Sequence, residues 1–164
     1  MSAAAAFGPA LGRLARAYEA DPDQRRDLLQ DLHLALWRSL ATFDGRCSLR
    51  TWVYRVAHNA AASYVLQRRR AKTAALTSLE DLDLPDAAAS PEEAMGEHQA
   101  LQRLMAIIRA LKPPDAQVML LYLEDLDAAA IGEITGLSAG AVANKIHRIK
   151  AVLAKRFHDR GASR

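Results

Sequence analysis

Leucine recurs at helical spacing through residues 24–41, and this pattern constrains the fold more than any other feature of the chain. Apolar residues that recur about every three or four positions line one face of an α-helix. In this segment they are Leu28, Leu29, Leu32, Leu36, Trp37 and Leu40. Similar patterns follow later in the chain, alanine and leucine dominate the composition, and runs of β-branched residues are absent. The sequence therefore predicts an all-α protein.

The helical segments fall into two groups separated by an acidic stretch. The first group has expected helices over 9–19, over 24–41, and from Ser48 into the run 68–70. Residues 71–90 lack sustained periodicity, and a second helical group follows them. We therefore predict two small helical domains, residues 1–70 and 91–164, joined by a flexible acidic linker, residues 71–90.

The formal charge changes sign twice along the chain. Residues 1–70 carry a net charge of +5, residues 71–96 carry −5, and residues 97–164 carry +3. Lysine and arginine concentrated in a domain favour contacts with polyanions. The layout suggests two modules that face polyanions, joined by a segment that does not.

The clearest local element lies near the C-terminus. Asp127 is positioned to cap a short helix, Gly136 provides a tight turn, and Ser138 is positioned to cap a longer basic helix. A short helix, a glycine turn and a basic helix are typical of a helix-turn-helix, whose second helix enters the major groove of DNA. The alternative is a helical hairpin with a solvated basic face, but the agreement of turn, caps and charge favours DNA binding.

The stretch "FDGRCSLRTWVYRVAHN", residues 43–59, interleaves arginine with large aromatic residues. Residues 45–70 contain six arginines and no acidic residue. Arginine pairs with phosphate, and aromatic rings stack on bases that have left a duplex. The stretch is therefore consistent with binding of single-stranded or melted nucleic acid. The alternative places Trp52, Val53 and Val56 in the core and leaves the arginines solvated.

The face of segment 24–41 opposite its leucine stripe also carries an apolar residue. Leu34 lies there among Asp27, Gln30, Asp31 and Arg38. A leucine on an otherwise charged face is consistent with a partner contact, although scattered surface leucines are common.

Signals for catalysis, cofactors and membranes are absent from the sequence. No phosphate-binding loop, nucleophile elbow or zinc-protease motif is found, and the five histidines are scattered. The single cysteine, Cys47, fits a reducing compartment, and no run of about 18 apolar residues is present. The N-terminal "MSAAAAFGPA" does not resemble a secretory signal. We therefore expect a cytoplasmic binding protein that is neither an enzyme nor a membrane protein and that uses no cofactor or metal.

The chain from about Phe7 to Phe157 resembles the bacterial sigma factors of the extracytoplasmic-function group. "DLLQDLHLALWRSL" is similar to the first motif of that family. "FDGRCSLRTWVYRVAHN" is similar to the second, with Trp52, Arg55 and Asn59 in the expected places. "LKPPDAQVMLLYLEDL" through "GLSAGAVANKIHRIK" is similar to the C-terminal promoter-binding domain.

The resemblance implies a protein that binds core RNA polymerase, recognises and melts promoter DNA, and is controlled by an anti-sigma factor, often a membrane-associated one. The implied polymerase surface is Asp27, Gln30, Asp31, Leu34 and Arg38. The implied minus-ten surface is Arg46, Arg50, Trp52, Tyr54, Arg55, His58, Asn59, Arg68, Arg69 and Arg70. The implied minus-thirty-five surface is Ser138, Asn144, Lys145, His147, Arg148 and Lys150. The acidic linker is expected to follow the polymerase RNA channel.

Several positions depart from the usual pattern of that family. They are Ser63, Leu66, Ala130, Gly132, Ala141 and Ala143. A glycine inside a helix, as expected for Gly132, costs about 1 kcal/mol relative to alanine. These departures leave the promoter sequence open. Two rival functions also stay open: a dimeric helix-turn-helix regulator that acts without polymerase, and an enzyme or RNA-binding helical protein. Whether the two domains lie apart or pack together, as a bound anti-sigma factor would allow, is also open.

Overall fold

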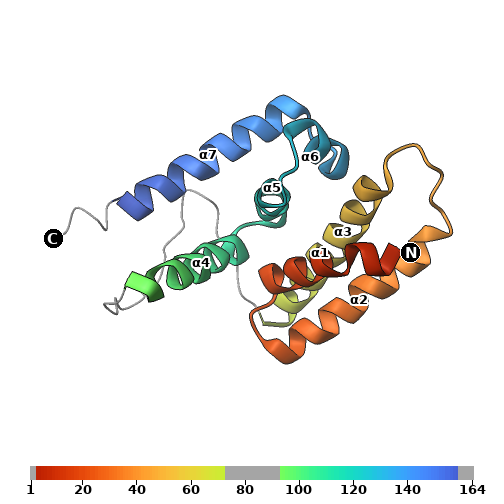
Figure 1. Ribbon diagram of the computed structural model, residues 1–164, viewed down its shortest axis with the longest axis horizontal. Coiled ribbons are helices and arrows are strands. Elements are labelled where there is room, and N and C mark those ends of the chain that lie inside the picture. The colour runs from red at the N-terminus through yellow and green to blue at the C-terminus, as the bar shows by residue number, and fades with distance from the viewer. Residues whose placement is uncertain (1–2, 73–92, 159–164) are drawn as a thin grey trace.

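The computed structural model describes residues 3–72 and 93–158, and all regular elements in these ranges are α-helices (Figure 1). In chain order they are α1 (Ala3–Tyr18), α2 (Pro22–Leu40), α3 (Leu49–Lys72), α4 (Glu93–Ala110), α5 (Pro113–Leu123), α6 (Ala128–Thr135) and α7 (Ala139–His158). The all-α prediction is confirmed. The expected linker, residues 71–90, lies almost entirely outside the described residues.

No helix in the ranges 3–72 and 93–158 combines the length and apolar character that a membrane crossing requires.

Local signals set the starts of α2 and α3. The Asp21 side chain caps α2 by accepting hydrogen bonds from the backbone N–H groups of Asp23 and Gln24, at 2.9 and 3.0 Å. Ser48 Oγ accepts from the Thr51 N–H at 3.0 Å before α3. The expected start of α1 at Pro9 is wrong, because the helix begins at Ala3. The alanines before Pro9 are strong helix formers, and the helix continues through Pro9 although proline lacks the N–H group for the usual helical hydrogen bond.

The helix-turn-helix of α6 and α7 has the predicted turn chemistry. Asp127 Oδ1 accepts from the Ala130 N–H at 2.8 Å, and Ser138 Oγ accepts from the Ala141 N–H at 3.1 Å. Gly136 between them has φ +80°, the left-handed conformation that glycine adopts without steric cost. These contacts arise within a few residues of chain, which is why the sequence predicted them.

Gly132 of α6 has a packing role that the sequence did not reveal. A Cβ atom at this position would lie 2.6 Å from the backbone oxygen of Leu137. The turn after α6 therefore approaches the helix so closely that a side chain does not fit. The departure of Gly132 from the usual family pattern therefore has a steric cause in this fold.

The N-terminal helices α1–α3 and the C-terminal helices α4–α7 pack against each other. Figure 1 shows α1–α3 grouped on one side of the molecule and α7 on the other, with α5 between them. One buried cluster joins Leu11 and Val53 of the first group to Ile107 and Ile149 of the second. This packing places the C-terminal half directly beside α3. The two halves therefore form a closed arrangement, whereas the sequence did not determine whether they pack together or lie apart.

Candidate functional site

The outer face of α2 is solvent-exposed and carries the residues expected to bind polymerase. Those residues are Asp27, Gln30, Asp31, Leu34 and Arg38, all of them exposed. Leu34 is 43% exposed, whereas Leu28 and Leu32 on the opposite face are fully buried. The face therefore combines acidic groups with exposed apolar surface.

Trp37 belongs to the same outer face, and its predicted place in the core is wrong. Its side chain is 73% exposed, whereas its neighbour Leu36 is buried. Trp37 lies three positions after Leu34 and therefore points in nearly the same direction from the helix. The spacing from Leu34 indicated this outward position. The prediction of a buried side chain followed instead from the general tendency of tryptophan to be buried.

The loop 43–48 and the start of α3 form a small aromatic unit. The rings of Phe43 and Trp52 lie 5.5 Å apart, and the half-buried Trp52 donates from Nε1 to Ser39 Oγ at 3.3 Å. Arg46 is exposed and forms an ion pair with Asp44 at 2.8 Å. Trp52 thus contributes to packing while part of its surface stays open to solvent.

Three residues of the expected minus-ten surface contact the C-terminal half. Arg50 Nη2 donates to the Glu124 carbonyl at 3.2 Å, and Arg55 Nη2 donates to the Glu133 carbonyl of α6. Tyr54 is only 5% exposed, and its hydroxyl group donates to a carboxylate oxygen of Glu124 at 3.1 Å. In this arrangement Tyr54 is buried against the C-terminal half, and Arg50 and Arg55 donate to its carbonyl groups, although Arg50 stays exposed.

Glu124, just after α5, is the main polar link between the halves. Its carboxylate accepts from Arg13 Nε and Nη2 of α1, at 2.6 and 2.8 Å, as well as from Tyr54. The hydrogen bonds from Arg13 lower the pKa of Glu124, and burial opposes this shift in part. The pKa of Tyr54 is raised by burial and by the Glu124 charge. Both groups therefore hold their ordinary protonation states at neutral pH.

His58, expected on the minus-ten surface, is buried between helices. It is 1% exposed, and its Nδ1 lies 3.3 Å from the Tyr18 hydroxyl group of α1. Its Nε2 has no hydrogen-bond partner among the described residues. Burial lowers the pKa of His58 to about 3, so the ring is neutral. In this arrangement His58 contributes to packing and cannot reach DNA.

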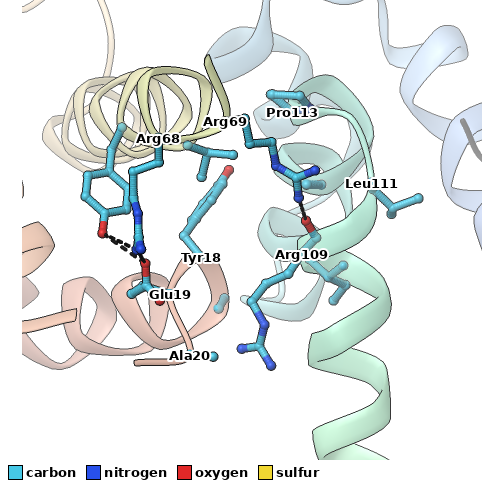
Figure 2. A pocket seen from close by; sticks show the side chains of 13 residues that line it. Tyr18, Glu19, Ala20, Arg68, Arg69, Arg109, Leu111 and Pro113 are labelled. Atoms are coloured by element: carbon cyan, nitrogen blue, oxygen red, sulfur yellow. Dashed lines mark hydrogen bonds and ion pairs between the residues drawn. The ribbon is translucent and has the colours of Figure 1, made fainter. Parts of the chain in front are cut away.

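Arginines at the C-terminal end of α3 also form hydrogen bonds with neighbouring parts of the fold. Arg68 donates to Glu19 and, at 3.0 Å, to the Tyr64 hydroxyl group. Arg69 Nη2 donates to the Arg109 carbonyl of α4 at 2.8 Å (Figure 2). The remaining residues expected on this surface, Asn59 and Arg70, are exposed.

The residues expected to bind the minus-thirty-five element fall into two sets. Asn144, His147 and Arg148 are exposed on α7, beyond the capping residue Ser138. Lys145 is instead a half-buried group that pairs with Asp115 of α5 at 2.5 Å. Lys150 Nζ donates to the Tyr122 hydroxyl group of α5 at 2.6 Å and lies 4.6 Å from the centre of that ring. The two lysines thus hold α7 against α5, and Lys150, like Asn144, His147 and Arg148, stays exposed to solvent.

Within the described ranges, no three histidine, cysteine, aspartate or glutamate side chains gather as a metal site.

Comparisons with known families match both halves of the chain. Residues 4–71 match the family model described as Sigma-70 region 2, and residues 101–153 match the one described as Sigma-70, region 4. The chain belongs to the sigma-70 family. Region 2 falls on α1–α3, and region 4 falls on parts of α4 and α7 with α5 and α6 between them. Membership in a family of transcription initiation factors confirms the prediction that the chain is not an enzyme.

Curated relatives of this sigma-70 chain cover most of its length. The RNA polymerase sigma factor CnrH of Cupriavidus metallidurans is 28% identical over 158 residues, which cover 91% of this chain and 81% of the relative. The ECF RNA polymerase sigma factor SigW of Bacillus subtilis is 27% identical over 147 residues, with 83% and 76% covered. The ECF RNA polymerase sigma-E factor of Escherichia coli is 27% identical over 136 residues, with 77% and 70% covered. These relatives confirm the predicted extracytoplasmic-function group.

Solved structures share the fold of this sigma-70 chain. The structure of CnrH in complex with the cytosolic domain of CnrY gives a TM-score of 0.66 at 23% identity, covering 95% of this chain and 85% of that chain. The sigma factor RpoE in complex with the anti-sigma factor NepR from Bartonella quintana gives 0.65 at 17% identity, covering 98% and 96%.

Proposed function

We propose that this sigma-70 chain binds core RNA polymerase in the cytoplasm and directs it to promoters, where it recognises two DNA elements and helps to open the duplex. The observation that carries this proposal is that regions 2 and 4 occur in one chain in this order. We assign residues 1–70 to polymerase and minus-ten binding, and residues 91–164 to minus-thirty-five binding.

The outer face of α2 is the proposed polymerase surface. Leu34 and Trp37 are exposed beside Asp27 and Asp31, although burial of their side chains would be favourable. Tryptophan is enriched among the residues that dominate protein–protein binding energy. Apolar surface rimmed by charge is typical of a protein interface.

The exposed polar groups of α7 and α3 are the proposed DNA contacts. Asn144, His147 and Arg148 follow the helix start that would enter the major groove, and they can donate hydrogen bonds to base edges or phosphates. Lys145 and Lys150 act indirectly, by holding α7 on α5. Arg46, Arg50, Asn59 and Arg70 are the exposed groups of the minus-ten set, and of these Arg50 also donates to the Glu124 carbonyl.

We further propose that the closed arrangement is the inactive form and that an anti-sigma factor, associated with the membrane, maintains it. The contacts of Arg50, Tyr54 and Arg55 with the C-terminal half support this proposal, because they occupy groups assigned to DNA. The solved relatives were captured in complexes with the cytosolic domain of CnrY and with the anti-sigma factor NepR. Polymerase binding would then have to separate the halves before the minus-ten surface can act.

Run-off transcription tests the proposal directly. Purified core polymerase is incubated with a pool of genomic promoter fragments, with and without this chain. Discrete new start sites that depend on the chain are expected. DNA binding without new transcripts, combined with no co-purification of polymerase, would instead support a helix-turn-helix regulator that acts alone.

A further inference from the structure

A cavity of about 330 Å³ opens where the end of α1, the last turns of α3 and the corner between α4 and α5 meet (Figure 2). It lies at the boundary between the two halves. Figure 2 shows Arg68 on one side and Arg69 and Arg109 on the other, with Tyr18 between them. The volume is within the range of small-molecule sites.

Among the described residues, arginines outnumber carboxylates around this cavity. Arg68, Arg69 and Arg109 line it, and Arg25 stands beside it with hydrogen bonds to the carbonyl groups of Glu19 and Ala20, at 3.1 and 2.7 Å. Glu19 is the one carboxylate among the lining residues of the described structure. Its oxygens already accept from Arg68 and, at 2.9 Å, from the Tyr64 hydroxyl group and the Asp21 N–H.

Asp21 is the other acidic group close to this cluster. Its charge interacts with those of Arg68 and Arg25, but its side chain is engaged as the cap of α2. Among the described residues, both acidic groups therefore stand at the α1 end of the cavity, and the arginines outnumber them.

Arg109 is the half-buried arginine that α4 contributes to the cavity. Its Nη1 donates to the Arg16 carbonyl at 3.1 Å, and no carboxylate of the described residues forms an ion pair with it. Burial lowers the pKa of Arg109 and the nearby charge of Arg25 lowers it further, whereas the charge of Glu19 opposes this shift in part. A half-buried guanidinium that has lost hydration and is repelled by a second cation gains from a bound anion.

We propose that this cavity binds a phosphorylated small molecule of the nucleoside phosphate class, with its phosphate among the guanidinium groups and its organic part against the apolar wall. Arginine presents a planar fork of donors that matches phosphate oxygens. Apolar side chains, including Val65, Ile108 and Leu111, line the rest of the cavity. A long nucleic acid strand fits this site poorly, because both halves enclose it in the closed arrangement.

A ligand here would bind residues of both sigma-70 regions at once. Arg68 and Arg69 belong to α3, and Arg109 belongs to α4. The bound molecule would therefore stabilise the closed arrangement by the free energy of its own binding. It would also occupy two arginines that we assign to the minus-ten surface.

Isothermal titration calorimetry of the full chain with ADP, and separately with pyrophosphate, tests this site. Saturable binding is expected for both probes, with tighter binding of ADP because the apolar wall contacts its nucleoside. Arg109→Gln removes the charge but keeps a donor for the Arg16 carbonyl. It should weaken ADP binding about tenfold or more, since a charge-assisted hydrogen bond is lost. Arg103→Gln on the same helix, outside the cavity lining, is the matched control and should bind as the parent chain does.

Three outcomes would overturn the proposal: no saturable binding of either probe, equal ADP affinity in Arg109→Gln and the parent chain, or displacement of ADP by a short single-stranded oligonucleotide. The last outcome would assign the phosphate site to DNA. If Arg109→Gln does not fold, NMR spectra of the parent chain give the answer. The arginine Nε–H signals of the cavity should shift on addition of ADP, and unchanged signals would contradict the site.

Discussion

The Tyr54 hydroxyl group of α3 donates a hydrogen bond of 3.1 Å to the Glu124 carboxylate just beyond α5. The two residues are 70 positions apart in the chain. Tyr54 lies in the segment assigned to promoter melting, and Glu124 lies in the half assigned to the upstream element. A single carboxylate, bound also by Arg13, thus joins the two sigma-70 regions and covers part of the proposed minus-ten surface.

Glu124→Lys should open the molecule. The substitution removes the acceptor for Arg13 and Tyr54 and places a cation beside Arg13 and Arg50. Loss of these charge-assisted contacts should disfavour the closed arrangement by about 1–3 kcal/mol. We expect a value near the lower end of this range, because Arg13 is partly solvated. Small-angle X-ray scattering should show a larger radius of gyration. Glu97→Lys, at an exposed position of α4, is the control, and equal radii for both variants would contradict the role of Glu124.

Trp37→Ala should weaken binding to core polymerase without lowering stability. The exposed indole contributes little to the fold of the free chain, but an interface tryptophan is often worth about 2 kcal/mol, or roughly thirtyfold in Kd. Asp31→Arg should act in the same direction by reversing charge on the same face. Leu101→Ala, which truncates an exposed leucine of α4, is the control. Normal binding of both α2 variants in a fluorescence anisotropy titration would exclude this face.

Arg148→Ala should weaken binding to the upstream promoter element while polymerase binding survives. Arg148 is exposed on α7, and a lost contact to a base or phosphate typically costs about 1–3 kcal/mol. DNase footprinting of the polymerase complex is the measurement. Unchanged protection of the minus-thirty-five region would contradict the assignment.

Gly132→Ala should destabilise the C-terminal half. Alanine gains about 1 kcal/mol in helix propensity over glycine, but its Cβ would lie 2.6 Å from the Leu137 oxygen, which is part of the rigid turn. We expect a net loss of about 1–2 kcal/mol in the free energy of unfolding by urea. Gly140→Ala is the control, because its Cβ would have no atom within 4 Å and should be neutral or stabilising. A stabilised Gly132→Ala variant would show that the turn can move.

Acid should destabilise the fold through His58. Its pKa falls from 6.5 to about 3 on folding because the ring is buried, so the unfolded chain binds the extra proton more readily. The contribution of the neutral, buried His58 ring to the free energy of unfolding is therefore fully present above pH 6.5 and is lost as pH falls toward 3. Between pH 7 and pH 5 the free energy of unfolding should fall by about 2 kcal/mol, before most carboxylates titrate. His58→Phe should flatten this dependence, and an unchanged slope would show that another group causes it.

The sequence alone determined the features that depend on neighbouring residues. The leucine period of α2, the caps at Asp127 and Ser138 and the turn at Gly136 all act within a few residues, so their consequences could be predicted directly. The same holds for the helical class and for the basic, solvent-exposed character of α7. A resemblance based on these motifs was enough to place the chain in its family.

Tertiary structure decided which of the candidate binding residues remain exposed and available to a partner. Lys145 and Arg148 look alike in sequence, but among the described residues only Lys145 forms an ion pair with a carboxylate of a distant helix, that of Asp115. The burial of His58 and the contact of Arg55 with Glu133 likewise depend on how separate helices pack. Contacts between residues far apart in the chain leave no local pattern, because their free energy arises only when the intervening chain has folded and brought them together.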